Sequence, residues 1–144
     1  MQVIVKPLDS VSDSSESVVI YAKGFGLTHE EATALSDVEA NSRAYTVAYG
    51  ITYDEDGIIT DITDITSDNT VDSTQLSDIQ KSPITGGIFD LTFSVTNGTN
   101  SVSIEVPVLV EPKYKETDET GTVVLGAHGF TLKNEEASLL DEEL

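Results

Sequence analysis

Apolar and polar residues alternate with a period of two over several long stretches of this chain. Aromatic and aliphatic side chains occupy every second position from 45 to 53, from 89 to 95 and from 102 to 110. A period of two places the apolar side chains on one face of a strand. The pattern therefore predicts three strands, and Asn97-Gly98 is a typical hairpin turn between the last two.

Further turn and strand signals surround these stretches. The segment 54–57, which ends in Gly57, predicts a tight turn that leads into a return strand over 58–66. Short apolar runs at 3–5, 18–21 and 123–125 predict three more strands. Pro107 has no N–H to donate, so we expect its strand to lie at a sheet edge or to have one unpaired side.

The chain also contains an internal repeat. Residues 18–35 align without gaps on residues 123–140, at an offset of 105, and 10 of the 18 positions are identical. The shared pattern is V-V-x-x-A-x-G-F-x-L-x-x-E-E-A-x-x-L. Each copy predicts a strand, a turn at Gly24 or Gly129 where glycine permits a positive φ, and the start of a helix. Thr28 and Glu31 have the spacing of a capping box.

The helical segments and the polar segments complete the picture. A period of 3.6 predicts one helix over about 30–44, with Leu35, Val38, Ser42 and Tyr45 on one face. The second copy predicts a helix over 135–144, which is too short to be stable without a docking surface. Residues 67–87 are polar and predict a long loop.

Together these elements predict an α+β, β-rich fold. We expect an antiparallel immunoglobulin-like β-sandwich with one longer helix, at about 30–44, and a short C-terminal helix. Residues 1–17 are expected to form an N-terminal strand and a flexible tether. Residues 18–144 then form a single domain, bracketed by the two copies of the repeat at 18–35 and 123–140.

The charge of the chain narrows the classes of partner. Among 144 residues, 26 are acidic and 7 are basic, which gives a formal net charge of -19. Like charges repel, so double-stranded nucleic acids and anionic membrane surfaces are poor partners. No apolar stretch is long enough to span a bilayer, and the first residues do not have the pattern of a signal peptide.

The residue types that catalysis and cofactor binding use are scarce. The absence of Cys excludes disulfides, thiolate zinc sites and a Cys nucleophile, and there are only two His and one Arg. Asp54, Asp56 and Gly57 resemble part of a calcium loop, but Thr63 stands where the bidentate Glu is needed. A hairpin turn is therefore the favoured interpretation. We predict a protein that is not an enzyme, with no cofactor and no metal.

Two groups of residues are candidates for contacts with a partner. Tyr45, Tyr49 and Tyr53 form a row that suits a sugar or a protein, although a half-buried sheet face is the commoner interpretation. The second copy of the repeat needs a surface to cover it, so we expect it to complete an interface between subunits. The predicted interface residues are Phe130, Leu132, Leu139, Leu140, Tyr45, Tyr49 and Tyr53.

In overall style the chain resembles bacteriophage virion accessory proteins, of the auxiliary or decoration type. The shared features are the small acidic β-sandwich, the 32 Ser and Thr residues, the absence of Cys and Trp and the lack of a signal peptide. The resemblance implies a structural protein that is made in the host cytoplasm and resides in the virion. It implies that the protein stabilises the capsid shell through contacts with the major capsid protein, other virion subunits or itself. The alternatives are a tail, collar or fibre component, a surface adhesion module and a carbohydrate-binding module.

Overall fold

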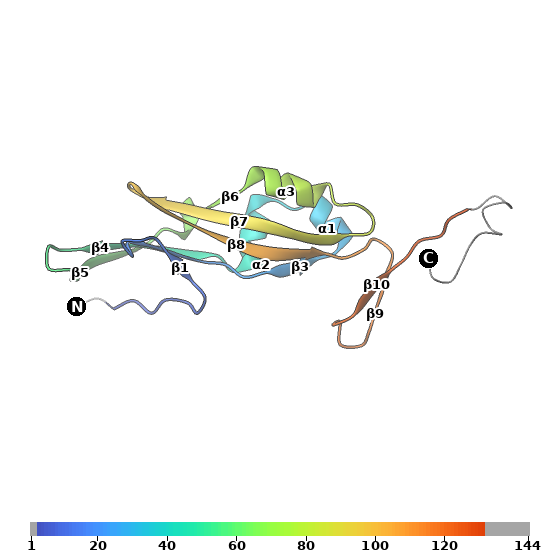
Figure 1. Ribbon diagram of the computed structural model, residues 1–144, viewed down its shortest axis with the longest axis horizontal. Coiled ribbons are helices and arrows are strands. Elements are labelled where there is room, and N and C mark those ends of the chain that lie inside the picture. Colours follow the sequence, from blue (N-terminus) through green and yellow to red (C-terminus); the bar gives the residue numbers. More distant parts are fainter. Residues whose placement is uncertain (1–2, 132–144) are drawn as a thin grey trace.

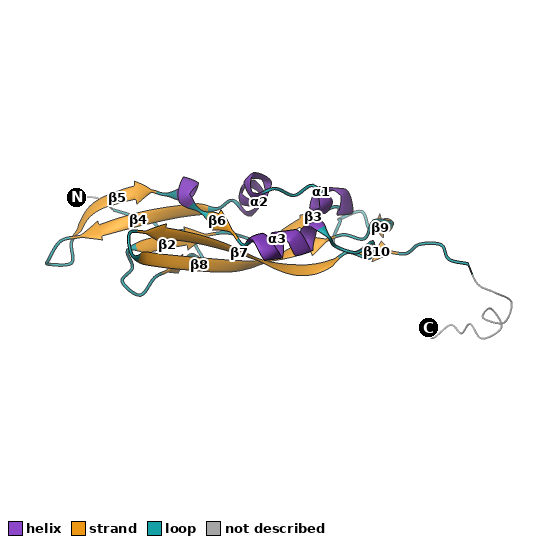
Figure 2. Cartoon of the chain, turned by 90° about the horizontal axis from the view of Figure 1, so that it is seen from above, coloured by secondary structure: helices purple, strands orange, loops and turns teal. Residues whose placement is uncertain are grey.

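The computed structural model describes residues 3–131 and shows an elongated, β-rich α+β molecule (Figures 1 and 2). Two four-stranded sheets and a separate two-stranded hairpin make up its β-structure. The first sheet has the order β1 (Val11–Ser12), β2 (Val18–Tyr21), β4 (Val47–Tyr53), β5 (Ile59–Asp64). The second sheet has the order β3 (Phe25–Leu27), β8 (Asn100–Val110), β7 (Gly87–Asn97), β6 (Thr70–Val71). The separate hairpin consists of β9 (Lys115–Thr117) and β10 (Val124–Gly126).

The long β7–β8 hairpin forms the centre of the second sheet and confirms the alternation in the sequence. All eleven residues of β7 pair with β8, from Gly87 opposite Val110 to Asn97 opposite Asn100. The two turn residues are therefore Gly98 and Thr99, one position later than the predicted Asn97-Gly98, because Asn97 still pairs within the ladder. Gly98 has a positive φ of 64°, which places the glycine at the first central position of the turn.

One core cluster joins apolar side chains of the two sheets with those of the three helices. Phe93, Leu91, Val106 and Val108 from the second sheet and Ile20 from the first are at most 4 % exposed and belong to one contiguous cluster. Such side chains each contribute about 1.5–3 kcal/mol when they are fully buried. The core therefore depends on residues that are far apart in the sequence.

The chain crosses from the first sheet to the second between β2 and β3. β3 then pairs in parallel with β8, with Phe25 opposite Val108 and Leu27 opposite Val110. All other neighbouring strands are antiparallel. The crossing gives the sheets the form of a curled, mixed half-barrel rather than that of a plain antiparallel sandwich.

Glycine permits a positive φ at position 24, but the φ of Gly24 is not positive. A Cβ at Gly24 would instead lie 2.7 Å from the carbonyl oxygen of Pro107. Glycine is needed here because the backbones approach closely. Pro107 itself lies on a central strand, not at a sheet edge, and β3 begins to pair only at the next residue, Val108. One side of Pro107 is thus without a ladder partner, as expected.

Three short helices lie among the described residues, and the single helix predicted over 30–44 is two of them. These are α1 (His29–Thr33) and α2 (Asp37–Ala44). The capping box of α1 is confirmed, since Thr28 Oγ1 accepts from Glu31 N and Glu31 Oε1 accepts from Thr28 N. Ser36 begins α2 with a second cap, and its Oγ accepts from Glu39 N at 3.2 Å.

The break between α1 and α2 changes which residues face the core. Leu35 is 1 % exposed, as predicted, but Val38 is 80 % exposed. Small side chains, Ala40 and Ala44, take the buried positions of α2. The predicted helix face with Val38 and Tyr45 is therefore wrong.

The polar segment 67–87, predicted as a loop, contains regular structure. It continues from the short 3-10 helix η1 (Thr66–Asp68) through β6 to α3 (Ser73–Gln80), whose N-cap Asp72 accepts from Gln75 N at 2.9 Å. Leu76 and Ile79 are buried, and α3 covers β7 (Figure 1). Two apolar positions were too few to produce a visible helical period.

The remaining predictions concern the two ends of the chain. Val3–Val5 do not form a strand, and the expected tether is shortened because residues 11–12 pair with β2 as β1. The C-terminal helix predicted over 135–144 lies outside the described residues.

Candidate interaction site at the C-terminal hairpin

The β9–β10 hairpin repeats the β1–β2 hairpin in its strand register. In the first hairpin, Ser12 pairs with Val19 and Val11 with Ile20. In the second, Thr117 pairs with Val124 and Glu116 with Leu125, so every partner is displaced by 105 residues. The internal repeat is thus a structural repeat as well, and it begins before residue 18.

The turns of the two hairpins repeat the same hydrogen bonds. Asp13 Oδ1 accepts from Val18 N at 2.9 Å, and Asp118 Oδ1 accepts from Val123 N at the same distance. The second carboxylate oxygen of Asp13 accepts from Ser15 Oγ at 2.5 Å, and that of Asp118 accepts from Thr120 Oγ1 at 2.5 Å. The residues at the tips, Glu16 and Gly121, are both in the left-handed region, with φ of 56° and 71°.

These hydrogen bonds lower the pKa of both aspartates. At Asp13 desolvation opposes ionisation, but hydrogen bonds from Ser15, Val18 and Ser17 outweigh it and lower the pKa to about 2. At Asp118 the hydroxyl of Thr120 and the amide of Val123 lower the pKa to about 2. A carboxylate that accepts several hydrogen bonds is stabilised in its charged form. Each aspartate therefore organises its turn as an anion.

The two hairpins differ in burial. Val18 and Ile20 are fully buried between the sheets, whereas their counterparts Val123 and Leu125 are 62 % and 69 % exposed. The same contrast holds for Phe25, which packs against the core, and Phe130, which is 71 % exposed. The second hairpin thus presents in solvent the side chains that the first hairpin buries. Apolar groups that are exposed together mark a contact surface.

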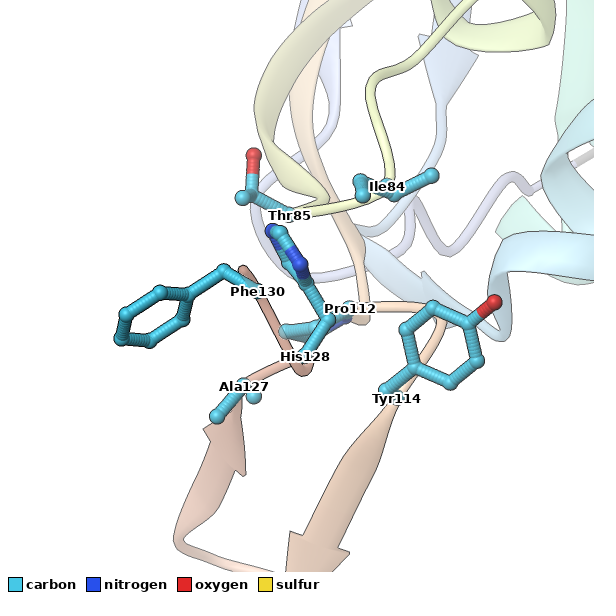
Figure 3. A pocket seen from close by; sticks show the side chains of 8 residues that line it. Ile84, Thr85, Pro112, Tyr114, Ala127, His128 and Phe130 are labelled. Atoms are coloured by element: carbon cyan, nitrogen blue, oxygen red, sulfur yellow. The ribbon is translucent and has the colours of Figure 1, made fainter. Parts of the chain in front are cut away.

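A cavity of about 320 Å³ lies where this hairpin meets the end of the second sheet (Figure 3). Its walls come from the loop after α3, from the chain between β8 and β9, and from the chain at the end of β10. The lining residues are Ile84, Thr85, Pro112, Tyr114, Gly126, Ala127, His128 and Phe130.

Backbone contacts hold the walls of this cavity together. Lys113 N donates to Ile84 O at 2.8 Å, and Ala127 N donates to Tyr114 O at 3.1 Å. The ring of Phe130 extends away from the other labelled side chains in Figure 3. The imidazole in its lining, His128, contacts the carbonyl oxygen of Gly129 through Nδ1 at 3.0 Å.

The three tyrosines among the predicted interface residues come from two different elements of the fold. Tyr49 and Tyr53 lie on β4, but Tyr45 has left-handed φ at the end of α2, and the Lys23 ammonium covers its ring at 4.4 Å. The hydroxyl of Tyr53 donates to Glu16 O at 2.9 Å, at the tip of the first hairpin. A continuous tyrosine platform is therefore absent from the described surface.

Phe130 is the predicted interface residue that the structure places at the C-terminal end, where it lines the cavity. Leu132, Leu139 and Leu140 lie outside the described residues. The sequence interpretation missed the turn residues Asp13 and Asp118 and the strands β1 and β9. The offset of 105 was the signal that identified them, since it continues upstream of residue 18.

The residues that resembled part of a calcium loop lie in a hairpin turn of the described structure. No group of three or more His, Asp or Glu side chains within residues 3–131 has the arrangement of a metal site. Asp54 Oδ1 instead accepts from Asp56 N and Ile58 N, both at 2.9 Å, as expected for a hairpin turn. His29 contacts the Ser82 carbonyl at 3.2 Å.

The chain matches no protein-family model, and its comparison with curated proteins finds no match. Within residues 3–131 no helix has the length and apolar character needed to cross a membrane.

Proposed function

We propose that the chain is a structural, non-catalytic module of an elongated protein assembly. Of the roles considered from the sequence, this corresponds to a tail, collar or fibre component of a virion, or to a surface adhesion module. The observation that supports it best is the repetition of the buried β1–β2 hairpin as β9–β10, which lies toward the opposite end of the long axis with its apolar side chains exposed (Figure 1). A module of this kind is suited to contacts at its two ends.

The course of the chain supports the same proposal. The first described residues lie at one end of the molecule and β9–β10 lies at the other (Figure 1). In an assembly, the chain would then run along the axis rather than return to its starting point. The exposed Val123, Leu125 and Phe130 gather at the far end, where the next component would lie.

We also propose that the half-barrel is a divergent immunoglobulin-like sandwich. Support comes from the two sheets of four strands that both contribute side chains to one core, since two such sheets also make up that fold. The segment 18–27 contributes to both sheets, because β2 belongs to the first sheet and β3 to the second. Its second part, β3, pairs in parallel with the last strand, β8. This division accounts for the departure from a purely antiparallel sandwich.

The net charge of -19 bears on the partners that this role requires. Modules of equal charge repel, and salt weakens that repulsion over distances beyond about 10 Å at 0.1 M ionic strength. End contacts made by apolar side chains remain effective when the charges are screened. The proposed partners are therefore proteins, and nucleic acids and anionic membranes are not among them.

Immunoelectron microscopy with antibodies against the isolated chain tests this function. Particles and cells of the organism that encodes the protein are labelled, and a strain from which the gene is deleted is the control. We expect label along tails, fibres or cell-surface filaments that is lost in the deletion strain. Label confined to the cytosol would contradict the proposal.

Capsid decoration, which the resemblance in overall style implies, remains a prediction. The same images distinguish it from a role in tails, fibres or surface filaments. Label spread over the icosahedral shell, together with co-sedimentation of the chain with assembled capsids, would favour it. The carbohydrate-binding alternative predicts binding to a glycan array that Tyr49→Ala abolishes. Tyr49 is the appropriate position because it is half-buried on β4, whereas Tyr45 already contacts Lys23.

A further inference from the structure

The structural repeat extends farther toward the N-terminus than the hairpins. With the same offset of 105, residues 3–35 align on residues 108–140, and 14 of these 33 positions are identical. The added identities include Val3, Val5 and Pro7, which match Val108, Val110 and Pro112. Val108 and Val110 form the end of β8, the last strand of the second sheet.

The N-terminal match shows the same contrast in burial as the C-terminal hairpin. Val108 and Val110 are fully buried, whereas Val3 and Val5 are 78 % and 88 % exposed. Segment 3–5 therefore has the sequence of a buried last strand but no sheet around it. Segment 113–131 likewise has the sequence of the first hairpin and β3, but none of the other strands described within residues 3–131 pairs with β9–β10.

We propose that this chain contains one complete unit of a tandem array with a period of 105 residues. The complete unit spans residues 8–112, segment 3–7 has the sequence of the end of a preceding unit, and β9–β10 is the first hairpin of a following one. The partner of the exposed hairpin is thus a further unit of this same fold. This inference rests on the proposed function and specifies what lies at each end of the module.

The contacts of the first hairpin define what the following unit must supply. β2 pairs with β4 on one side, through Val18 opposite Gly50 and Tyr21 opposite Val47, and it packs against β7 and β8. β3 requires the end of β8. All of these strands lie within residues 40–112, and this segment has no second copy in the chain.

The junction between the units is already ordered. Pro112 packs so closely on Gly126 that a Cβ there would lie 2.3 Å from the proline Cβ. Glu111 forms an ion pair with Lys115, and Lys113 N donates to Ile84 O. Contacts on both sides of the junction therefore fix the direction in which the following unit would continue.

The test is to extend the full chain with the segment that the second copy lacks. Because Leu144 aligns with Glu39, residues 40–112 are appended after Leu144, which completes a second stretch of 105 residues. Hydrogen exchange of the amides in 115–126 is measured by NMR in the original and in the extended chain. We expect protection to rise by at least about 100-fold on extension, as for amides inside a folded domain.

Gly129 provides a matched variant. A Cβ at Gly129 meets no atom within 4 Å in the present structure, whereas its counterpart Gly24 lies against Pro107. Gly129→Ala should therefore leave the original chain unchanged but remove most of the added protection from the extended chain. Equal behaviour of Gly129→Ala in both contexts would contradict the proposal.

A chimera keeps the proposal falsifiable if the extended chain does not fold. Residues 8–39 of the full chain are replaced by residues 113–144, which are equal in number. We expect cooperative unfolding and protected amides in the transplanted strands. A chimera that remains unfolded would overturn the proposal.

Two further results would overturn the proposal. The first is an extended chain in which the amides of β7 and β8 stay protected while those of 115–126 exchange as fast as before. The second is an original chain whose hairpin amides are already protected, as a monomer or a dimer. Either result leaves the proposed structural role to be decided by the localisation experiment, which does not depend on the tandem unit.

Discussion

A methyl group added at Gly24 should disturb the pairing of β3 with β8 and so destabilise the fold. A Cβ at this residue would lie 2.7 Å from Pro107 O and 3.0 Å from Pro107 Cγ. Ordinary van der Waals contact begins at 3.4 Å, so either β3 or β8 must move by about 0.7 Å. The oxygen belongs to the backbone of a central strand and cannot rotate away. The movement therefore disturbs the parallel pairing of β3 with β8.

The size of the effect follows from what β3 buries. Overpacking in a well-packed region costs about 1–3 kcal/mol. Leu27, at the end of β3, is 2 % exposed, so a displaced strand also loses part of the roughly 1.5–3 kcal/mol of its burial. We expect Gly24→Ala to lower the free energy of unfolding by about 2–4 kcal/mol.

Gly26→Ala, two residues further along and within β3, is the matched control. The nearest atom to a Cβ at Gly26 is Leu109 O at 4.0 Å, so the methyl group fits. Its effect should be small or stabilising by about 0.4–1 kcal/mol, because alanine restricts the unfolded chain. Urea unfolding, followed by far-UV circular dichroism and by the fluorescence of the five tyrosines, compares the two variants. With slopes of about 1–3 kcal/mol/M, midpoints should differ by about 1 M or more. Equal midpoints would refute the argument from close approach.

Two further predictions concern the core and the first turn. Phe93→Ala removes a fully buried side chain and should lower the free energy of unfolding, measured by thermal unfolding, by about 3–5 kcal/mol. Val38→Ala, at a side chain that is 80 % exposed, should change it by less than about 0.5 kcal/mol. Similar losses in the two variants would place the core elsewhere. Asp13 has a folded-state pKa of about 2, below its ordinary value of 3.8, so its contribution is present above about pH 4 and is lost as pH falls toward 2. Asp13→Asn should therefore lower stability by about 1 kcal/mol at pH 7, after allowance for solvent screening, and by almost nothing at pH 2. A difference that is constant with pH in urea titrations would argue against the role of the carboxylate.

The β7–β8 hairpin and its apolar face could be predicted from the local sequence pattern. Alternation from 89 to 95 and from 102 to 110 fixes which face of each strand is apolar. It does not fix the register, because a shift of two residues keeps the same face, and the observed turn is Gly98-Thr99 rather than Asn97-Gly98. The capping box at Thr28 was equally local, since its two hydrogen bonds join residues three apart. Such features depend on side chains that are close in sequence, and the surrounding fold does not alter them.

The division of the predicted helix could not be obtained in this way. Ser36 and the buried Leu35 break the segment because Leu35 must reach the core while α2 turns only its small residues, Ala40 and Ala44, inward. The helix α3 escaped prediction because Leu76 and Ile79 are its only two buried residues, and its contacts are with the distant strand β7. Packing against a distant strand decided both cases, and periodicity contains no information on that strand.

At the candidate site, too, the sequence determined one feature and the tertiary structure decided another. The sequence determined by itself that a segment is duplicated at an offset of 105, because identity in register does not depend on folding. It did not reveal that Val18 is buried while Val123 is exposed, since both have the same side chain and almost the same neighbours in sequence. Only the tertiary structure decided this, because burial depends on β4, β7 and β8, which cover the first hairpin and have no counterpart around the second among the described residues.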